Sequence, residues 1–213
     1  MHVSAMNCGR AFFESYLSGR EHLRILDVGG MDVNGSLRAV VPSSTWEYLA
    51  VDIELGAGVD MVLADPYAFP FAENSFDAVV TTSCFEHDAM FWLTYVEMCR
   101  VVKTGGYVYI NAPSGGPYHA YPTDCWRFYP DAGLALAAWA GRCGYQVNLC
   151  ESFTIIDTRE PWNDFVCIHR KACERDTSTG FIYATMDVAN VRLPGSVETA
   201  PVTGPVPSAH PRR

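Results

Sequence analysis

Short apolar runs alternate along the chain with segments of helical periodicity. The runs are apolar and often β-branched, so they predict buried strands rather than surface loops. They cover residues 23–28, 46–52, 60–65, 76–83, 107–113, 145–154 and 164–171.

Two segments between these strands have the pattern of amphipathic helices. Apolar residues of 89–102 recur at helical spacing, and the Lys-Thr-Gly-Gly sequence at 103–106 is expected to end that helix. Pro130 and Asp131 suit the first turn of a second helix, which runs to Gly144. Strands that alternate with helices predict an α/β fold. We expect a Rossmann-like, mostly parallel sheet with helices on both faces and a ligand site beyond the C-terminal strand ends.

The two ends of the chain differ from this central pattern. We expect one domain over residues 1–171, which begins with a helical segment at 8–20. Residues 193–213 contain five prolines and no aromatic residue, which predicts a disordered tail. Residues 172–192 are an uncertain extension, either an extra strand or an interface segment, and a homodimer stays possible.

Charge and cysteine content narrow the class of partner. The chain has 15 basic and 24 acidic residues, a net charge of −9, and this disfavours a nucleic-acid partner. Its eight cysteines contain no CxxC pair, so we expect reduced thiols in a cytoplasmic protein. No signal peptide and no apolar run of transmembrane length is visible, which predicts no membrane partner.

A glycine turn follows the first strand, but it lacks the glycines of a dinucleotide fingerprint. Gly29 and Gly30 come directly after the strand, whereas Met31 and Val33 occupy positions where a pyrophosphate needs close backbone approach. A ligand without phosphates tolerates these side chains better. S-adenosylmethionine is such a ligand.

Acidic residues end three successive predicted strands. Asp52 can accept hydrogen bonds from both ribose hydroxyls, Asp65 can accept from the adenine amino group, and Asp27 is expected near the ammonium end of the cofactor. Each acid taken alone is equally explained as a cap or turn residue. Together they favour a positively charged nucleoside.

Four segments resemble the successive motifs of class I S-adenosylmethionine-dependent methyltransferases, and most closely the small bacterial type-11 group. They are "ILDVGG", "YLAVDIELGAGVDMVLADPYAFPF", "SFDAVVTTSCFEH" and "KTGGYVYINAPS". The resemblance covers roughly residues 22–170. It implies a seven-stranded sheet whose last strand is antiparallel, with S-adenosyl-L-methionine as cofactor.

The resemblance also implies roles for residues around the turn. Gly29 and Gly30 would lie beneath the methionine part, and Ile53 would lie against the adenine. The family usually has glycine where Met31 and Val33 stand, so Asn34 and Gly35 are expected to supply those contacts. The residues expected on the methionine side are Ser83, Cys84 and Phe85.

A long aromatic loop over residues 114–130 is expected to form a lid over the acceptor. His119 or Asp124 could take the acceptor's proton, and Arg127 could hold an anionic group. The alternative is a self-packed lid in which Asp124 and Arg127 are paired. The aromatic side chains expected to bind substrate are Tyr118, Tyr121 and Trp126.

His87 is the other catalytic candidate, because it follows the fourth strand near the expected methyl group. A buried, hydrogen-bonded structural histidine explains it as well. A metal held by Asp65, His119 and Asp124 is conceivable, but nothing in their spacing demands one, so no metal is assigned.

These patterns predict methyl transfer, by in-line displacement, to a hydroxyl or amine of a small molecule such as a sugar, a glycan or a secondary metabolite. Two alternatives stay open. An NAD-dependent oxidoreductase could use Asp52 to bind ribose, although Met31 and Val33 argue against it. A non-catalytic S-adenosylmethionine-binding module would keep the same cofactor site.

Overall fold

The strands predicted from the apolar runs form one sheet in the computed structural model, which describes residues 2–157, 159, 161–172 and 181–195. The strand order is β3-β2-β1-β4-β5-β7-β6-β8. Strands β1 to β5 pair in parallel, β7 runs antiparallel between β5 and β6, and β8 runs antiparallel to β6. The bounds are β1 (Arg24–Val28), β2 (Glu47–Asp52), β3 (Met61–Val62), β4 (Phe76–Thr82), β5 (Val102–Pro113), β6 (Val147–Ile155), β7 (Asp164–Lys171) and β8 (Val188–Arg192).

The predicted Rossmann-like sheet and its antiparallel β7 are confirmed, but the sheet has eight strands rather than seven. The additional strand, β8, comes from the extension at 172–192. Its residues Val188 and Ala189 pair with Ile155 and Thr154 of β6. Without β8, the backbone groups along the outer edge of β6 would lack a strand partner.

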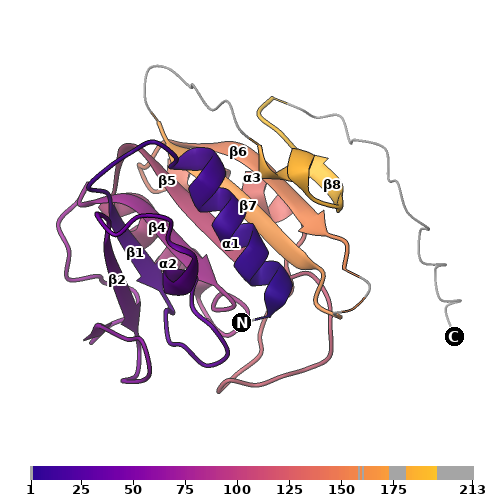
Figure 1. Cartoon of the computed structure of the whole chain (residues 1–213), viewed down its shortest axis with the longest axis horizontal. Helices are drawn as coiled ribbons and strands as arrows, with labels where there is room; N and C mark the ends of the chain where they lie inside the picture. The colour runs from indigo at the N-terminus through magenta and orange to yellow at the C-terminus, as the bar shows by residue number, and fades with distance from the viewer. Residues whose placement is uncertain (1, 158, 160, 173–180, 196–213) are drawn as a thin grey trace, which may run out of the picture.

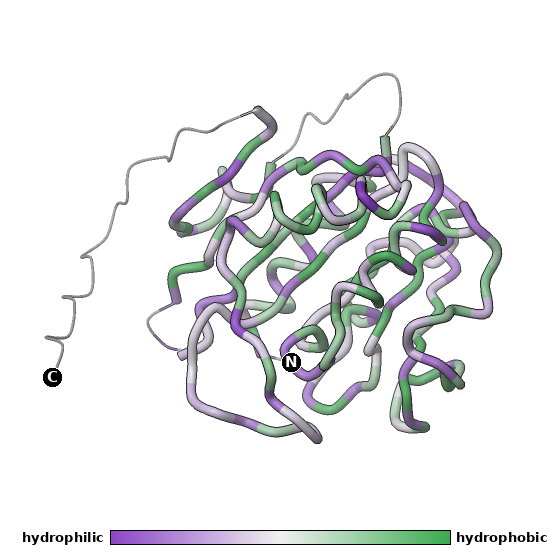
Figure 2. Tube along the Cα trace, turned by 180° about the vertical axis from the view of Figure 1, so that it is seen from behind, coloured by the Kyte–Doolittle hydropathy of each residue, from purple (hydrophilic) through white to green (hydrophobic). Residues whose placement is uncertain are grey.

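Helices cover both faces of the sheet and create two hydrophobic cores. Helix α1 (Val3–Tyr16) crosses the front of β5 and β7 in Figure 1, and its Phe12 is fully buried with its ring 4.9 Å from that of Tyr109. Helices α2 (Phe91–Val101) and α3 (Asp131–Arg142) pack on the opposite face. Hydrophobic residues gather along the central strands, and the loops around them are more hydrophilic (Figure 2).

The first helix begins and ends earlier than the expected segment 8–20. Its buried stripe already includes Ser4 and Ala5, so the helix begins at Val3. Gly19 has a φ of +73°, a left-handed conformation that no helix residue adopts, and the helix ends before it.

Residues 103–106 belong to β5 and do not form the predicted turn after the second helix. Helix α2 ends at Val101, and β5 begins at the next residue. The Lys103 Nζ atom donates to Asp77 Oδ2 at 2.8 Å, and a Cβ on Gly106 would lie 2.6 Å from the Asp77 carbonyl oxygen. These contacts fix an irregular pairing between β4 and β5, whose register shifts between Phe76 and Ala78.

A buried carboxylate attaches the extension to the domain. Glu151 on β6 is fully buried and accepts hydrogen bonds from the Tyr16 hydroxyl at 2.6 Å and from the backbone N–H groups of Ile182 and Tyr183 at 2.8 and 3.0 Å. The last two residues belong to the 3₁₀-helix η2 (Ile182–Thr185), which therefore docks beside α1.

Residues 196–213 of the expected tail lie outside the described part of the chain. Within the described part, no helix has the length and apolar character needed to cross a membrane. The seven cysteines described there are all free thiols.

Candidate active site

A cavity of about 770 Å³ opens at the C-terminal ends of β1, β2 and β4. The segments that follow these strands form its floor and walls, and residues 119–123 of the predicted lid form part of its roof. His2 and Trp162, which are far apart in the sequence, close one side. This is the position at which a parallel α/β sheet is expected to bind a ligand.

Tight packing explains both glycines of the turn after β1. Gly29 has a φ of +73°, and a Cβ added there would lie 2.4 Å from the Cys84 sulfur. A Cβ on Gly30 would lie 2.8 Å from the Ala50 Cβ atom. Both N–H groups donate to the Val51 carbonyl oxygen, at 2.9 and 3.1 Å. The turn therefore leaves room for a ligand directly above the sheet edge.

The turn does not lead into the helix that a dinucleotide site requires. Across residues 29–46, all of which the structure describes, the only helical element is the 3₁₀-helix η1 (Leu37–Val40). Met31 and Val33 line the cavity at the positions where a phosphate would need open backbone. Asn34 and Gly35 line it as well.

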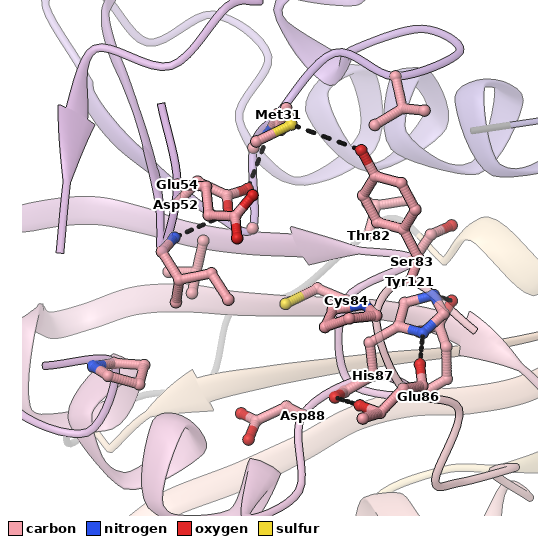
Figure 3. Close-up of a pocket in the computed structure, with 18 of the residues that line it drawn as sticks. Met31, Asp52, Glu54, Thr82, Ser83, Cys84, Glu86, His87, Asp88 and Tyr121 are labelled. Carbon is pink, nitrogen blue, oxygen red and sulfur yellow. Dashed lines mark hydrogen bonds and ion pairs between the residues drawn. The ribbon is translucent and has the colours of Figure 1, made fainter. Parts of the chain in front are cut away.

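Asp52 lies on the cavity wall at the end of β2. Its Oδ1 accepts the Ile53 N–H at 2.7 Å, and its Oδ2 accepts the Met31 N–H at 3.2 Å. Figure 3 shows this carboxylate beside Met31, whose sulfur faces Tyr121 across the cavity. Two backbone donors leave the carboxylate with lone pairs for a ligand's hydroxyl groups.

The structure does not bring the other two predicted acids to the cavity wall. Asp27 lies beneath the turn, where it accepts a hydrogen bond from the Tyr48 hydroxyl at 2.7 Å and where burial raises its pKa to about 6. Strand β3 ends at Val62, so Asp65 does not end a strand. Asp65 accepts the Tyr67 N–H at 2.8 Å in an exposed turn. Of the three predicted carboxylates, only Asp52 therefore lines the cavity.

Other acids, which the sequence did not single out, line the cavity instead. They are Glu54, Glu86 and Asp88. The Asp88 carboxylate accepts the Tyr67 hydroxyl at 3.0 Å and the Met90 N–H at 2.9 Å, so it also fixes the entry to α2. No Lys or Arg lines the cavity among the described residues, so its charged side chains favour a cationic ligand.

Of the residues expected on the methionine side, Ser83 and Cys84 line the cavity and Phe85 does not. Phe85 is fully buried and packs between the rings of Phe91 and Phe128, at 5.6 and 6.3 Å. Its role is therefore in the core.

His87 is held in one tautomer by the lid. Its Nδ1 lies 2.5 Å from the Thr123 carbonyl oxygen, which can only accept, so Nδ1 carries the proton. Burial lowers the pKa of this imidazole, so the ring is neutral at pH 7 and its Nε2 keeps a lone pair. Glu86 is next to it, with Oε1 at 3.7 Å from that Nε2, and burial raises the Glu86 pKa to about 7.

Asp124 and Arg127 form the internal pair that was the alternative interpretation of the lid. The Arg127 guanidinium donates to both Asp124 oxygens, at 2.5 and 2.8 Å, and holds the pKa of that carboxyl far below its usual range. Neither residue lines the cavity. Asp124 is therefore a poor proton acceptor, and the same pairing withdraws Arg127 from the acceptor site.

The lid contributes only part of its aromatic side chains to the cavity. His119 and Tyr121 line it, whereas Tyr118 is 77% exposed and Trp126 packs on Phe91 with its Nε1 donating to the Asp88 carbonyl. Trp162 lines the cavity with its ring 4.5 Å from that of His119. His2 joins it because its Nε2 binds the Asp164 carboxylate at 2.9 Å. No local pattern in the sequence marked His2 or Trp162.

Comparison with known proteins gives a domain match and a fold. Residues 6–110 match the family model described as a methyltransferase domain. The 1,6-didemethyltoxoflavin-N1-methyltransferase of Burkholderia thailandensis, solved with bound 1,6-didemethyltoxoflavin and S-adenosylhomocysteine, is 16% identical with a TM-score of 0.60, over 80% of this chain and 79% of that one. A SAM-dependent methyltransferase from Archaeoglobus fulgidus is 15% identical with a TM-score of 0.55, over 78% and 94%.

A further similar structure, the [4+2]-cyclase SpnF, is 14% identical with a TM-score of 0.55, over 78% of this chain and 81% of that one. The fold is therefore shared by proteins named for different reactions. The comparison with curated proteins gave no match.

Proposed function

We propose that this chain is a class I S-adenosylmethionine-dependent methyltransferase of the type-11 group and that its acceptor is the hydroxyl or amine of a small molecule. The observation that carries the proposal is a cavity of about 770 Å³. Asp52 and the turn at residues 29–30 line one end of it, and His87 and His119 line the other. This volume lies in the range of small-molecule sites.

The cavity wall fits the cofactor chemically. S-adenosylmethionine, when bound, supplies a methyl group already activated by a positively charged sulfonium. Acidic side chains without a neighbouring Lys or Arg suit that charge. The space above Gly29 would be lost if the residue had a Cβ, because Cys84 would have to move.

We assign the cofactor contacts to the residues that line this wall. Asp52 binds the ribose hydroxyls, and Ile53, half exposed beside it, lies against the adenine. Gly29 and Gly30 support the methionine part, with Ser83 and Cys84 across from them. Asp65 has no part in this assignment, because it accepts a turn N–H outside the cavity.

The acceptor lies at the histidine end. His87 presents an unprotonated Nε2 to the cavity, so this imidazole can accept the proton of a hydroxyl or amine as the nucleophile attacks. His119 is oriented from the lid, and Tyr121 and Trp162 restrict access of water from that side. Positioning of the nucleophile in line with the methyl group supplies most of the rate.

This chain lacks two features that an NAD-dependent oxidoreductase would need. Its pyrophosphate would meet the side chains of Met31 and Val33, and η1 does not provide the N-terminus of an α-helix. A non-catalytic binding module differs from the proposal only in turnover. Cytoplasmic location and the homodimer stay predictions.

Calorimetry with S-adenosylhomocysteine and with NAD tests the cofactor assignment directly. We expect saturable binding of the first and none of the second. Transfer of a labelled methyl group to hydroxyl and amine acceptors then tests catalysis. Binding of NAD in preference to S-adenosylhomocysteine would overturn the proposal, and binding without transfer to any acceptor would favour the non-catalytic module.

A further inference from the structure

Three side chains capable of binding a metal meet at the histidine end of the cavity. Glu86 and His87 follow β4, and His119 comes from the lid, 32 residues further along the chain. One potential ligand atom from each lies within 4.8 Å of the others. The two imidazole rings are 4.9 Å apart and nearly perpendicular. A side-chain movement of the order of 1 Å would bring the three atoms to the spacing of a coordination sphere.

Both imidazoles are held at Nδ1, which leaves Nε2 as the ligand atom. His87 Nδ1 donates to the Thr123 carbonyl oxygen at 2.5 Å. His119 Nδ1 lies 3.4 Å from both Asp124 Oδ2 and Arg127 Nη2. That Nη2 is the hydrogen-bond partner of His119 Nδ1 and also donates to Asp124 and to the Pro117 carbonyl, while Asp124 Oδ2 accepts the His119 backbone N–H at 2.8 Å. In metal sites, the ring nitrogen that does not bind the ion is commonly held by neighbouring polar groups, which fixes the orientation of the ring.

The third side chain has an oxygen without a partner. Glu86 is 1% exposed, and its Oε2 has no hydrogen-bond partner. Its other oxygen is 3.7 Å from His87 Nε2, too far for a hydrogen bond. Buried carboxylate oxygens are rarely left unsatisfied, because the loss of hydration is costly. A bound cation would satisfy this oxygen and would bind the Nε2 atoms of both imidazoles.

We propose that Glu86, His87 and His119 bind a divalent transition-metal ion such as Zn²⁺. Two imidazole nitrogens and one carboxylate are a common ligand set for Zn²⁺, and they leave a coordination position that faces the cavity. Asp124 acts as a positioning residue, since its carboxylate accepts the His119 backbone N–H and so fixes the lid at this residue. Its own charge is neutralised by Arg127.

The metal site stands on this geometry alone, whereas its part in catalysis rests on the proposed function. In the open position the ion would bind an acceptor hydroxyl and lower the pKa of that group. The hydroxyl proton then leaves to water, the oxygen forms its bond to the methyl carbon, and the carbon–sulfur bond breaks with its electron pair on sulfur. With the ion bound, the His87 lone pair is a ligand and no longer a free base.

The test measures metal binding without turnover. Full-length protein is stripped with a chelator and titrated with Zn²⁺ by calorimetry, and with Co²⁺ by visible absorption. We expect one ion per chain and weaker binding by at least about 10-fold in Glu86→Gln and His119→Ala. Asp124→Asn should weaken binding by a smaller factor, while His22→Asn, at an exposed histidine outside the cavity, should bind as the wild type does.

Three outcomes would overturn the metal site. The first is the absence of binding in the wild type, and the second is wild-type affinity in both Glu86→Gln and His119→Ala. The third is a sulfur-to-cobalt charge-transfer band, which would assign the ion to cysteine. Circular dichroism of each variant excludes unfolding as the cause. S-adenosylhomocysteine binding, measured on the same stripped samples, tests the proposed function separately.

Discussion

The hydroxyl of Tyr121 lies 3.9 Å from the sulfur of Met31, so the lid contacts the turn after β1 across the cavity. Figure 3 shows the two side chains meeting end to end. The two walls of the cavity, one assigned to the cofactor and one to the acceptor, therefore touch through Met31 and Tyr121. This contact holds the lid over the part of the cavity that we assign to the cofactor.

Asp52→Ala should weaken S-adenosylhomocysteine binding by one to two orders of magnitude, because about 1.5–3 kcal/mol of charge-assisted hydrogen bonding is lost. Asp65→Ala is the matched control and should change affinity less than about twofold, since Asp65 lies outside the cavity. Calorimetry measures both. Equal affinities for Asp52→Ala and wild type would exclude the ribose contact.

Gly29→Ala should destabilise the fold by about 2 kcal/mol or more, because its φ of +73° strains any side chain and the new Cβ would meet the Cys84 sulfur. Gly141→Ala is the control, since nothing lies within 4 Å of its Cβ position and it stands in α3, where alanine is favoured by about 0.5–1 kcal/mol. Urea denaturation gives both values. We expect Gly29→Ala to lower the free energy of unfolding and Gly141→Ala to raise it. A change of the same sign in both variants would contradict this explanation of the turn.

Glu151→Ala should detach the extension from α1. It leaves the N–H groups of Ile182 and Tyr183 and the Tyr16 hydroxyl without their acceptor, at a cost of about 2–3 kcal/mol. Hydrogen exchange at the two amides should accelerate. Glu47→Ala removes an exposed ion pair with Arg24 and should cost less than about 1 kcal/mol. Unchanged amide protection in Glu151→Ala would show that packing alone holds the extension.

His169 should stay neutral well below pH 6.5, because burial lowers its pKa to about 4. Its Nε2 donates to the Gly133 carbonyl at 2.8 Å, and its Nδ1 lies 3.0 Å from the Tyr95 hydroxyl. The unfolded chain binds the proton more readily, so this histidine's contribution to stability is complete above pH 6.5 and is lost as pH falls toward 4. NMR titration of the ring protons measures the pKa directly, and a midpoint near 6.5 would be inconsistent with this burial.

The fold could be predicted from the sequence where apolar runs dictate burial. The run at 164–171 became β7 with the same bounds, because both faces of that strand are buried. Chain ends were harder to predict. Whether 172–192 adds a strand depends on the contacts of Glu151 with Ile182 and Tyr183, which bring distant residues together and leave no local periodicity.

The site was predictable only in part, because contacts between residues distant in sequence also decide which side chains reach the cavity. Asp52 ends its strand on the cavity wall, as the pattern indicated, whereas β3 ends three residues before Asp65. The Asp124–Arg127 pair shows that charged residues in a lid can bind each other and stabilise the loop instead of binding substrate. Spacing along the chain cannot distinguish these outcomes, because orientation is set by backbone contacts far away in sequence.

The family match ends at residue 110, and the roof of the cavity comes from residues 119–123 and Trp162, which lie beyond it. The cofactor wall and the roof are therefore separate stretches of one polypeptide. Chimeras that exchange the 114–130 loop between relatives should redirect the enzyme to a different acceptor and leave affinity for the methyl donor intact. Such a result would make residues 114–130 the segment that sets the acceptor, independently of the strands that bind the donor.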